Sequence, residues 1–456
     1  DATQPVGADL SRPSPIDRPD DKKQHGKGKG QVWLMPTDGG EAHQLTFMPH
    51  GASHPTWSPD SKQLIFSSQV GPLDEETEDG KPLPKARVID RLFYRLDGVG
   101  FIYERRQHLF LIDIAGSESQ KREPLQLTDG DWDDSDPAWS PDGTRIAFSS
   151  SRGEDRWRNP CPDIYTLSLN NGQERPQGSS LPHGEAPPSG QPSRVGATLA
   201  VALACLTDGT LSSRSPSWSP DGKTLAYLAK PKLRSGNHME LFTIAADARE
   251  GSPRGLTSEF EGSCSDWTNS DVTDEHILPP PVWSPDGKTL YLLAAQRGAS
   301  RVFAIPAKGA GKQPPTLTPG NVHVLDFNVD ASKRNVAILI ENPTHVAEIF
   351  MCSTASPGEL RKVTGFNDAL FDELTLASPE YMPYTGTDGW PMDGWILKPQ
   401  GFDPKQKYPL IVEIHGGPAT QYGYGFMHEM QMLVATGHVV LYTNPRGSIG
   451  YGRDFS

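Results

Sequence analysis

Residues 407–456 read KYPLIVEIHGGPATQYGYGFMHEMQMLVATGHVVLYTNPRGSIGYGRDFS. The short apolar runs Pro409–Ile414 and His438–Thr443 each predict a buried strand. Between them, Phe426–Thr436 carries apolar side chains three and four residues apart, as a helix buried on one face does. Strand, glycine loop, helix and strand form a βαβ unit, so the two strands are expected to lie parallel in one sheet.

The loop after the first of these strands, His415 to Pro418, is a candidate functional site. Its two glycines let the backbone turn sharply and come close to a bound atom. A loop in this position can donate backbone N–H groups to a developing oxyanion. Because proline has no N–H, Gly417 and, after it, Gly416 are the candidate donors. A tight turn without chemistry is the alternative, and the later string NPRGSIGYG favours the functional interpretation.

Three strings together resemble the start of the hydrolase domain in the prolyl oligopeptidase family, in particular its acylaminoacyl-peptidase branch: HGGP, NPRGSIGYG and the preceding TGTDGWPMDGWILKP. The resemblance implies a serine peptidase that hydrolyses short peptides through a Ser-Asp-His triad and needs no cofactor. It also implies that His415, Gly416 and Gly417 form the oxyanion-hole loop. In prolyl oligopeptidase and dipeptidyl-peptidase relatives a tyrosine stands where this sequence has His415, so the second donor is expected from the residue after the serine.

The nucleophile itself is absent from these 456 residues, because no G-x-S-x-G elbow occurs between Asp1 and Ser456. The nearest string, Arg446 to Gly450, has arginine in place of the first glycine. In the family that the sequence resembles, the triad follows the NxRGSxGYG segment, so it is expected beyond Ser456. We therefore expect this chain to be a fragment or one piece of a nicked enzyme, inactive unless a second polypeptide supplies the triad.

Composition narrows the class of protein further. The formal net charge of −14 disfavours nucleic acid and anionic membranes as partners, since both reward clustered Lys and Arg. The apolar stretch Val195–Leu206 is too short to span a bilayer. The four cysteines show neither a disulfide framework nor metal-ligand spacing, so they are expected to be free thiols in the cytoplasm: Cys161, Cys205, Cys264 and Cys352.

An internal repeat dominates the upstream sequence. WSPD occurs four times, each copy followed by a short apolar strand, and Ser-Pro-Asp-Gly is typical of a turn. The tryptophan before each turn is expected to pack between neighbouring sheets. The copies are Trp57–Asp60, Trp139–Asp142, Trp218–Asp221 and Trp283–Asp286, with Phe327–Asp330 as a degenerate fifth.

A second marker alternates with WSPD: an apolar strand, a polar turn, and then Leu-Thr or Val-Thr. Its six threonines are Thr46, Thr128, Thr207, Thr257, Thr318 and Thr364. Short strands at this spacing predict an all-β propeller of six or seven blades over residues 1–371, followed by the incomplete α/β-hydrolase domain over 372–456. Gly71–Lys85 and Asn171–Arg194 are expected to be insertions, and Lys22–Lys29 a linker.

Other candidate groups give weaker indications of function. Asp129–Asp136 lacks the glycine and glutamate of an EF-hand loop, so no calcium site is inferred, and the scattered histidines predict no metal site. Arg446 is a candidate for binding a substrate carboxylate or carbonyl, against a structural ion pair as the alternative. Tyr422 and Tyr424 are candidates for lining the substrate cleft, against packing in the sheet.

Two rival functions stay open at this stage. The chain could be a non-catalytic propeller that binds a protein partner, with the βαβ unit as a vestige. It could also be an esterase on the same fold. Self-association is a further possibility, and the sequence identifies no interface for it.

Overall fold

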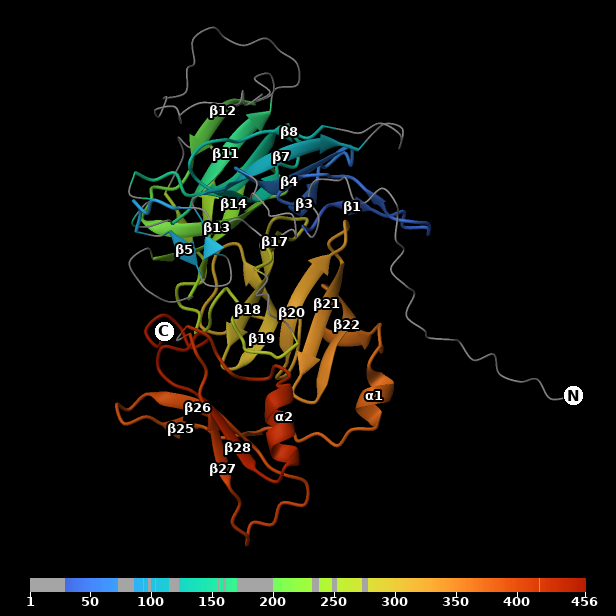
Figure 1. The fold of residues 1–456 in the computed structure, drawn as a ribbon, viewed down its shortest axis with the longest axis vertical. Coiled ribbons are helices and arrows are strands. Elements are labelled where there is room, and N and C mark those ends of the chain that lie inside the picture. The colour runs from blue at the N-terminus through green and yellow to red at the C-terminus, as the bar shows by residue number, and fades with distance from the viewer. Residues whose placement is uncertain are drawn as a thin grey trace, which may run out of the picture.

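A computed structural model describes residues 29–72, 86–114 and 123–169 apart from a few interior positions, then 200–231, 238–247, 252–272, 278–417 and 419–456. The predicted insertion at Asn171–Arg194 lies outside the described residues, as do most of Gly71–Lys85 and nearly all of the predicted linker. Antiparallel sheets follow one another along the molecule, and the C-terminal unit lies at one end (Figure 1). Within the described residues, no helix has both the length and the apolar character to cross a bilayer.

Three four-stranded antiparallel sheets come first, each with its strands in chain order. The first contains β3 (Ser53–Trp57), β4 (Gln63–Val70), β7 (Arg106–Asp113) and β8 (Leu125–Gln126). The second contains β9 (Asp134–Trp139), β10 (Arg145–Ser150), β11 (Asp163–Leu169) and β12 (Ala200–Cys205). The third contains β13 (Leu211–Trp218), β14 (Thr224–Pro231), β15 (Glu240–Ala245) and β16 (Arg254–Gly255).

A seven-stranded sheet continues the series and combines two further repeats. Its first half is β17 (Val282–Trp283), β18 (Thr289–Gln296) and β19 (Ala299–Pro306). Its second half is β20 (His323–Val329), β21 (Asn335–Asn342), β22 (His345–Ser353) and β23 (Ser356–Lys362). One parallel pair, Ser300 with His323, joins the halves. Two small sheets are separate: β1 (Trp33–Leu34) with β2 (His43–Gln44), and β5 (Arg95–Leu96) with β6 (Gly100–Phe101). The predicted all-β repeat class is confirmed.

The tryptophan of WSPD joins one sheet to the sheet before it, as predicted. Each indole N–H donates to the backbone carbonyl of the residue just before the preceding tryptophan. The pairs are Trp139 to Thr56 (3.2 Å), Trp218 to Ala138 (3.1 Å) and Trp283 to Ser217 (3.2 Å). These three rings are at most 9% exposed, whereas Trp57, the first of the series, is 49% exposed.

The Ser-Pro-Asp turn is held by its own side chains. The Ser140 hydroxyl donates to Asp142 over 2.6 Å and accepts the N–H of Arg145 over 2.9 Å. That hydroxyl also lowers the pKa of Asp142. The turn's last position has positive φ, which Gly143 adopts at 71°.

The predicted register of the fifth copy is wrong. Val329, not Phe327, occupies the position of the WSPD tryptophan. It lies opposite Val336 at the start of the next strand, as each of those tryptophans lies opposite a residue at the start of its next strand. Asp330 takes the place of the turn serine and accepts the hydroxyl of Ser332 over 2.8 Å, so acceptor and donor have exchanged positions. A search for the letters WSPD cannot detect such an exchange, because the hydrogen bond survives while both residue types change.

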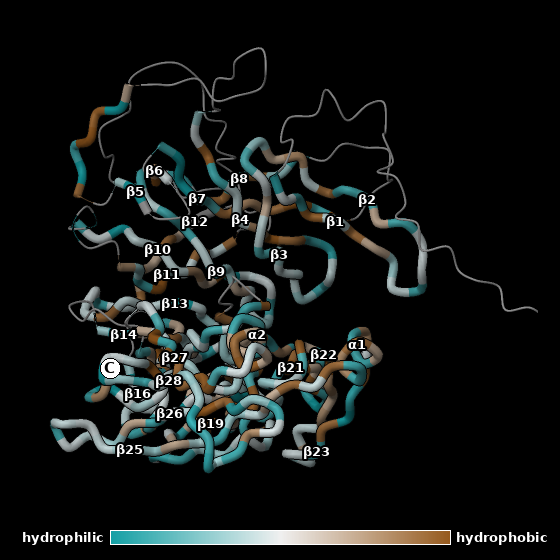
Figure 2. Tube along the Cα trace, turned by 60° about the horizontal axis from the view of Figure 1, so that its bottom comes forward, coloured by the Kyte–Doolittle hydropathy of each residue, from teal (hydrophilic) through white to brown (hydrophobic). Residues whose placement is uncertain are grey.

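The threonines of the second marker have a common role. Each threonine hydroxyl oxygen accepts a hydrogen bond from a backbone N–H of the apolar strand that begins the same marker. This bond fixes the segment that carries the threonine against that strand. The donors are Val32, Leu109, Ile164, Leu241, Val302 and Ile349, at 2.8 to 3.1 Å. Apolar clusters fill the spaces between successive sheets, as in the cluster of Leu228, Leu241, Leu290 and Phe303. Brown hydrophobic segments accordingly recur along the strands (Figure 2).

The C-terminal unit is a five-stranded sheet with the order β24-β26-β28-β27, and β25 pairs with β26. Its elements are β24 (Glu380–Tyr381), β25 (Tyr384–Thr385), β26 (Pro391–Leu397), β27 (Leu410–Glu413), α2 (His428–Ala435) and β28 (Val439–Asn444), after a short α1 (Asp368–Asp372). β27 and β28 are parallel, as the βαβ pattern predicts.

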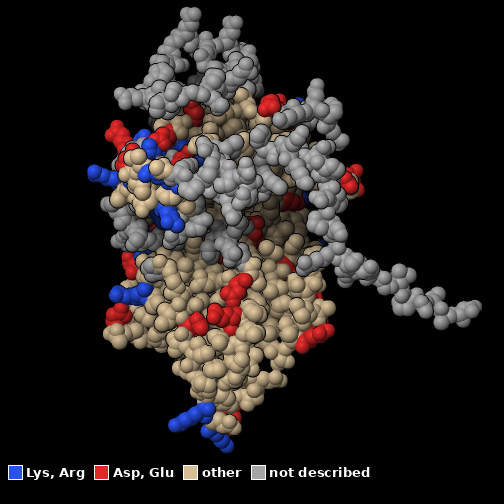
Figure 3. All heavy atoms as spheres, in the orientation of Figure 1, with Lys and Arg blue, Asp and Glu red and all other residues tan. Residues whose placement is uncertain are grey.

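The predicted burial of the first βαβ strand is wrong. Leu410 is 57% exposed, Val412 50% and Ile414 78%, because these alternate residues point to one face of the edge strand β27, and the described residues leave that face uncovered. On α2 the predicted core residues Met430 and Val434 are buried. Met432, on the same helix, is 56% exposed. On the face in Figure 3 this unit carries few charges, with blue Lys and Arg atoms at its lower tip.

Candidate active site

The loop that follows β27 is open to solvent at the carboxyl end of the parallel pair. Gly416 and Gly417 are both exposed, and among the described residues no acceptor is recorded for either backbone N–H. Gly417 has φ +118°, and a Cβ there would lie 2.7 Å from the backbone nitrogen of Ala419. Only glycine suits this position, so the sharp turn expected from the sequence is present.

Hydrogen bonds hold His415 against the NPRGS segment. Its Nε2 lies 2.9 Å from the Ser448 hydroxyl oxygen, and its Nδ1 lies 3.0 Å from the hydroxyl of Thr420. The Ser448 hydroxyl donates to Pro445 O over 2.7 Å, so it accepts from His415 Nε2–H. The imidazole therefore orients the loop. Thr420 O also accepts the N–H of Ile449 over 3.0 Å, which joins the same two segments through the backbone.

Ser448 is not placed as a nucleophile. It is fully buried and its proton goes to a backbone carbonyl. A nucleophile elbow also needs a helix immediately after the serine, and no helix is assigned within residues 445–456. This agrees with the sequence argument that RGSIG is not an elbow.

The two predicted substrate-binding residues, Tyr422 and Arg446, have different surroundings. Tyr422 is 7% exposed and packs against Trp395 and Tyr442, and burial raises its pKa to about 12. Arg446 is half-exposed, and its Nε forms an ion pair with Asp388 Oδ2 at 2.7 Å. The structure thus places Tyr422 within the core of the C-terminal unit and Arg446 in an ion pair at its surface.

Sequence reasoning missed Asn444, which supports the loop from below. Its side chain accepts the N–H of Tyr422 and donates to Tyr422 O, both over 2.8 Å, and it donates to the Tyr451 hydroxyl over 2.9 Å. Asn444 is fully buried at the end of β28. The signal was the asparagine of NPRGS itself, whose amide can satisfy a backbone donor and acceptor together.

A second missed feature is a cavity of about 850 Å³ bordered by β3, β9, β13 and β17. The first strands of four successive repeats thus border one cavity. Three lining residues, each three positions before a tryptophan, share a positive φ of 53°, and each is followed by proline. They are His54, Asp136 and Ser215. The signal was the recurring proline two residues before each WSPD tryptophan.

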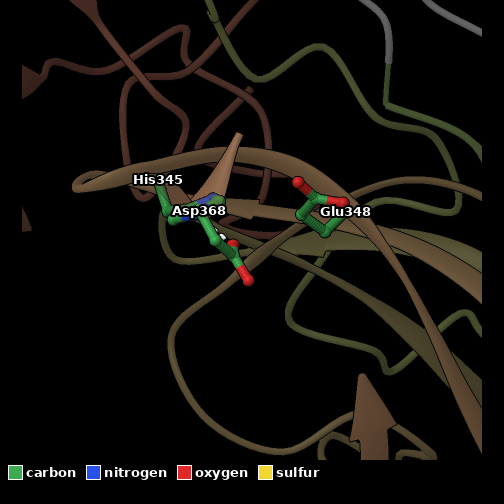
Figure 4. Close-up of side chains that lie close together, drawn as sticks. All are labelled: His345, Glu348 and Asp368. Carbon is green, nitrogen blue, oxygen red and sulfur yellow. Dashed lines mark hydrogen bonds and ion pairs between the residues drawn. The ribbon is translucent and has the colours of Figure 1, made fainter. Parts of the chain in front are cut away.

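One group of possible metal ligands occurs among the described residues: His345, Glu348 and Asp368 (Figure 4). His345 Nε2 lies 3.0 Å from Asp368 Oδ1, and the Lys362 ammonium donates to that same oxygen. Glu348 accepts the N–H of Asn367 over 3.1 Å and the hydroxyl of Thr364. A lysine ammonium already neutralises Asp368, so this geometry is that of a structural cluster.

Comparisons with known proteins show similarity to peptidases. No family model matches the chain. It is 28% identical to the uncharacterized peptidase YuxL of Bacillus subtilis, over 93% of this chain and 59% of that protein. It is 25% identical to dipeptidyl-peptidase 5 of Porphyromonas gingivalis, over 88% of this chain and 53% of that protein. Both of these similar proteins are named peptidases.

A solved structure shows the same fold. The acylaminoacyl peptidase of Pyrococcus horikoshii superimposes with a TM-score of 0.63 at 20% sequence identity, over 93% of this chain and 56% of that one. The chain therefore spans somewhat more than half the length of the proteins that it matches. The resemblance stated from the sequence motifs is confirmed.

Proposed function

We propose that this chain is part of a serine peptidase of the acylaminoacyl-peptidase type that hydrolyses short peptides. The observation that carries the proposal is the exposed Gly416-Gly417 loop at the carboxyl end of β27, where active sites of α/β sheets form. Similarity to named peptidases over about nine-tenths of the chain supports it.

The open edge of β27 suggests how the site is completed. A further parallel strand beside β27, connected by a helix packed on the face that carries Leu410, Val412 and Ile414, would bury these side chains, and the carboxyl end of the strand would lie beside Gly417. A serine at that end, outside residues 1–456, would attack the peptide carbonyl. Histidine would act as its base and aspartate would orient the histidine. The N–H of Gly417 would stabilise the oxyanion, a contribution of roughly 3 to 4 kcal/mol.

We further propose that the repeated sheets form a closed propeller of six or seven blades that limits access to short or unfolded peptides. Support comes from the shared cavity and from the chain of indole hydrogen bonds that links successive sheets. The cavity gives the sheets a common centre, as the blades of a propeller have.

A fluorophosphonate probe tests the catalytic proposal. In the whole protein, including any polypeptide that supplies the serine, one serine outside residues 1–456 is expected to become labelled, while the 456-residue chain by itself is not labelled and hydrolyses no peptide. Absence of labelling in the whole protein would favour a non-catalytic binding module. Preference for ester over peptide substrates would favour an esterase. Turnover by the 456-residue chain, verified by intact mass, would contradict the placement of the triad.

A further inference from the structure

Gln421 lies four residues after Gly417 of the candidate oxyanion loop and is fully buried between the β-repeat sheets and the C-terminal unit. Its backbone N–H donates to Trp267 O over 3.1 Å, and its carbonyl accepts the N–H of Asn269 over 2.9 Å. These two bonds form a parallel bridge to Thr268 in the segment between β16 and β17. The backbone of Gln421 is thus fixed to the repeat sheets although it belongs to the C-terminal unit.

The side chain of Gln421 makes two further bonds to the same sheets. Its Oε1 accepts the N–H of Gly298 over 3.1 Å, and its Nε2 donates to the Thr268 hydroxyl over 2.7 Å. Gly450 packs closely against this amide, since a Cβ at residue 450 would lie 2.4 Å from Gln421 Oε1. Both the donor and the acceptor of the Gln421 side-chain amide therefore form hydrogen bonds across the boundary between the two units.

Behind Thr268 the connection continues to a buried charged group. The Thr268 hydroxyl donates to Asp266 Oδ1 over 2.6 Å, and the other carboxylate oxygen lies 2.7 Å from His323 Nε2. His323 Nδ1 lies 2.7 Å from Glu341 Oε1, which also accepts the N–H of Phe426 over 3.1 Å. Because hydrogen bonds to buried ionised groups are the strong ones, Thr268 is a rigid support for Gln421.

On its other side Gln421 is joined directly to the loop. Thr420 precedes it, and the Thr420 hydroxyl lies 3.0 Å from both His415 Nδ1 and Gly416 O. A displacement of Gln421 therefore also moves Thr420, whose hydroxyl bonds to His415 and to Gly416 O. These bonds hold the peptide unit between Gly416 and Gly417 in place. A shift of about 1 Å in such a unit can cost about a hundredfold in rate.

We propose that Gln421 is the positioning residue through which the repeat sheets hold the His415–Gly417 loop in the geometry that its amide donors need. The inference rests on the proposed function for its catalytic consequence. Its structural part, the support of the loop from the repeat sheets, can be measured without any activity.

The variants are Gln421→Met, which removes both side-chain bonds at similar volume, and Thr268→Val, which removes the hydroxyl between Gln421 and Asp266. Gln431→Met is the matched control. Gln431 is also a buried glutamine of the C-terminal unit, and its amide bonds to Pro343 in the repeat region and to the backbone of Ala377, away from the loop. Thr268→Val lies in the repeat sheets, so it tests the inference even where Gln421→Met disturbs folding.

Hydrogen exchange of peptides covering residues 415–420 and 445–451 is the first measurement, on the 456-residue chain and on the whole protein. Gln421→Met and Thr268→Val are expected to raise exchange there about tenfold, and Gln431→Met to leave it unchanged. Equal exchange in all three variants, or no change in any, overturns the inference whatever the activity.

Peptide hydrolysis by the whole protein is the second measurement. Both test variants are expected to lower kcat about tenfold with KM within about twofold, since the loop acts on the transition state. The control should retain both constants. A wild-type protein without hydrolysis or fluorophosphonate labelling would refute the proposed function, while the exchange result would still decide the support of the loop. A rise in KM with unchanged kcat would overturn the positioning role.

Discussion

One indole N–H joins each WSPD sheet to the sheet before it, and the first tryptophan of the series has no such role in the described structure. Trp283 is 4% exposed and bonded to Ser217 O, whereas Trp57 is half-exposed. The two residues occupy the same place in the repeat, so they form a natural pair for comparison.

Trp283→Phe is expected to lower the free energy of unfolding by about 2 kcal/mol, because it leaves a buried carbonyl without its donor and removes packed ring atoms. Trp57→Phe is expected to change it by less than about 0.5 kcal/mol. Urea denaturation followed by circular dichroism measures both. Equal losses would show that the indole bond between sheets contributes nothing specific.

At the scale of single residues, the sequence predicted the packing role of the WSPD tryptophans correctly but aligned the fifth copy of the repeat incorrectly. The role of the WSPD tryptophans followed from their place before a turn. The fifth copy was misaligned because Asp330 and Ser332 exchange the roles of donor and acceptor. Asn444 and Gln421 went unnoticed because each forms its bonds with segments distant in sequence, which no local pattern records.

Between elements, the two units come close together at two glycines. A Cβ on Gly423 would lie 1.8 Å from Gly298 O, and Tyr424 N donates to the same oxygen over 2.9 Å. The loop after β18 and the segment after Thr420 therefore pack backbone against backbone.

Gly423→Ala is expected to destabilise the protein by about 3 kcal/mol, since neither backbone can move without breaking these bonds. Gly416→Ala is the control for stability, because a Cβ there has nothing within 4 Å. Thermal unfolding compares the two variants. A Gly423→Ala protein as stable as the control would mean that the two units are not packed this closely.

The buried group around His323 gives stability a defined pH dependence. Burial opposes its charging, but the carboxylates of Asp266 and Glu341 outweigh burial and raise the pKa of His323 to about 10. A histidine whose pKa is higher in the folded protein stabilises it fully below the unfolded value near 6.5, and loses this contribution as the pH rises through about 10.

His323→Gln is therefore expected to cost the most near pH 6, with the difference from wild type narrowing steadily towards pH 10. Free energies of unfolding in urea at pH 6, 8 and 10 give the comparison. A difference that is constant over this range would show that the imidazole is not held in its charged form.

At the scale of elements the sequence predicted the βαβ unit, its parallel strands and its helix. It failed on the burial of β27, because periodicity shows that a strand is apolar but not whether a neighbour covers it. The contacts of Gln421 could not be predicted from the sequence either, because they depend on how three segments are placed relative to one another: residues 266–271, 297–298 and 421–426.

For the whole molecule, the uncovered edge of the C-terminal sheet is the largest departure from expectation. Leu410, Val412 and Ile414 present apolar side chains and unpaired backbone groups along one strand. Exposed apolar edge strands promote association with other chains.

The 456-residue chain is accordingly expected to bind a hydrophobic dye and to self-associate with rising concentration. Val412→Lys is expected to reduce both effects, because a charged residue on an edge strand opposes pairing. Analytical ultracentrifugation and dye fluorescence measure them, with the exposed helix variant Met432→Lys as the control. Association that Val412→Lys leaves untouched would place the interface elsewhere.

The indole bonds between sheets have a consequence for how such a protein can vary. Trp57, Trp139, Trp218 and Trp283 are unequally spaced along the chain, yet three of them make the same bond at the same point beside the central cavity. The indole bonds thus align each sheet with the one before it, and segments away from these bonds can differ in length. A tag inserted away from these bonds should be tolerated, whereas deleting Ala138 would displace the carbonyl that accepts the indole N–H of Trp218.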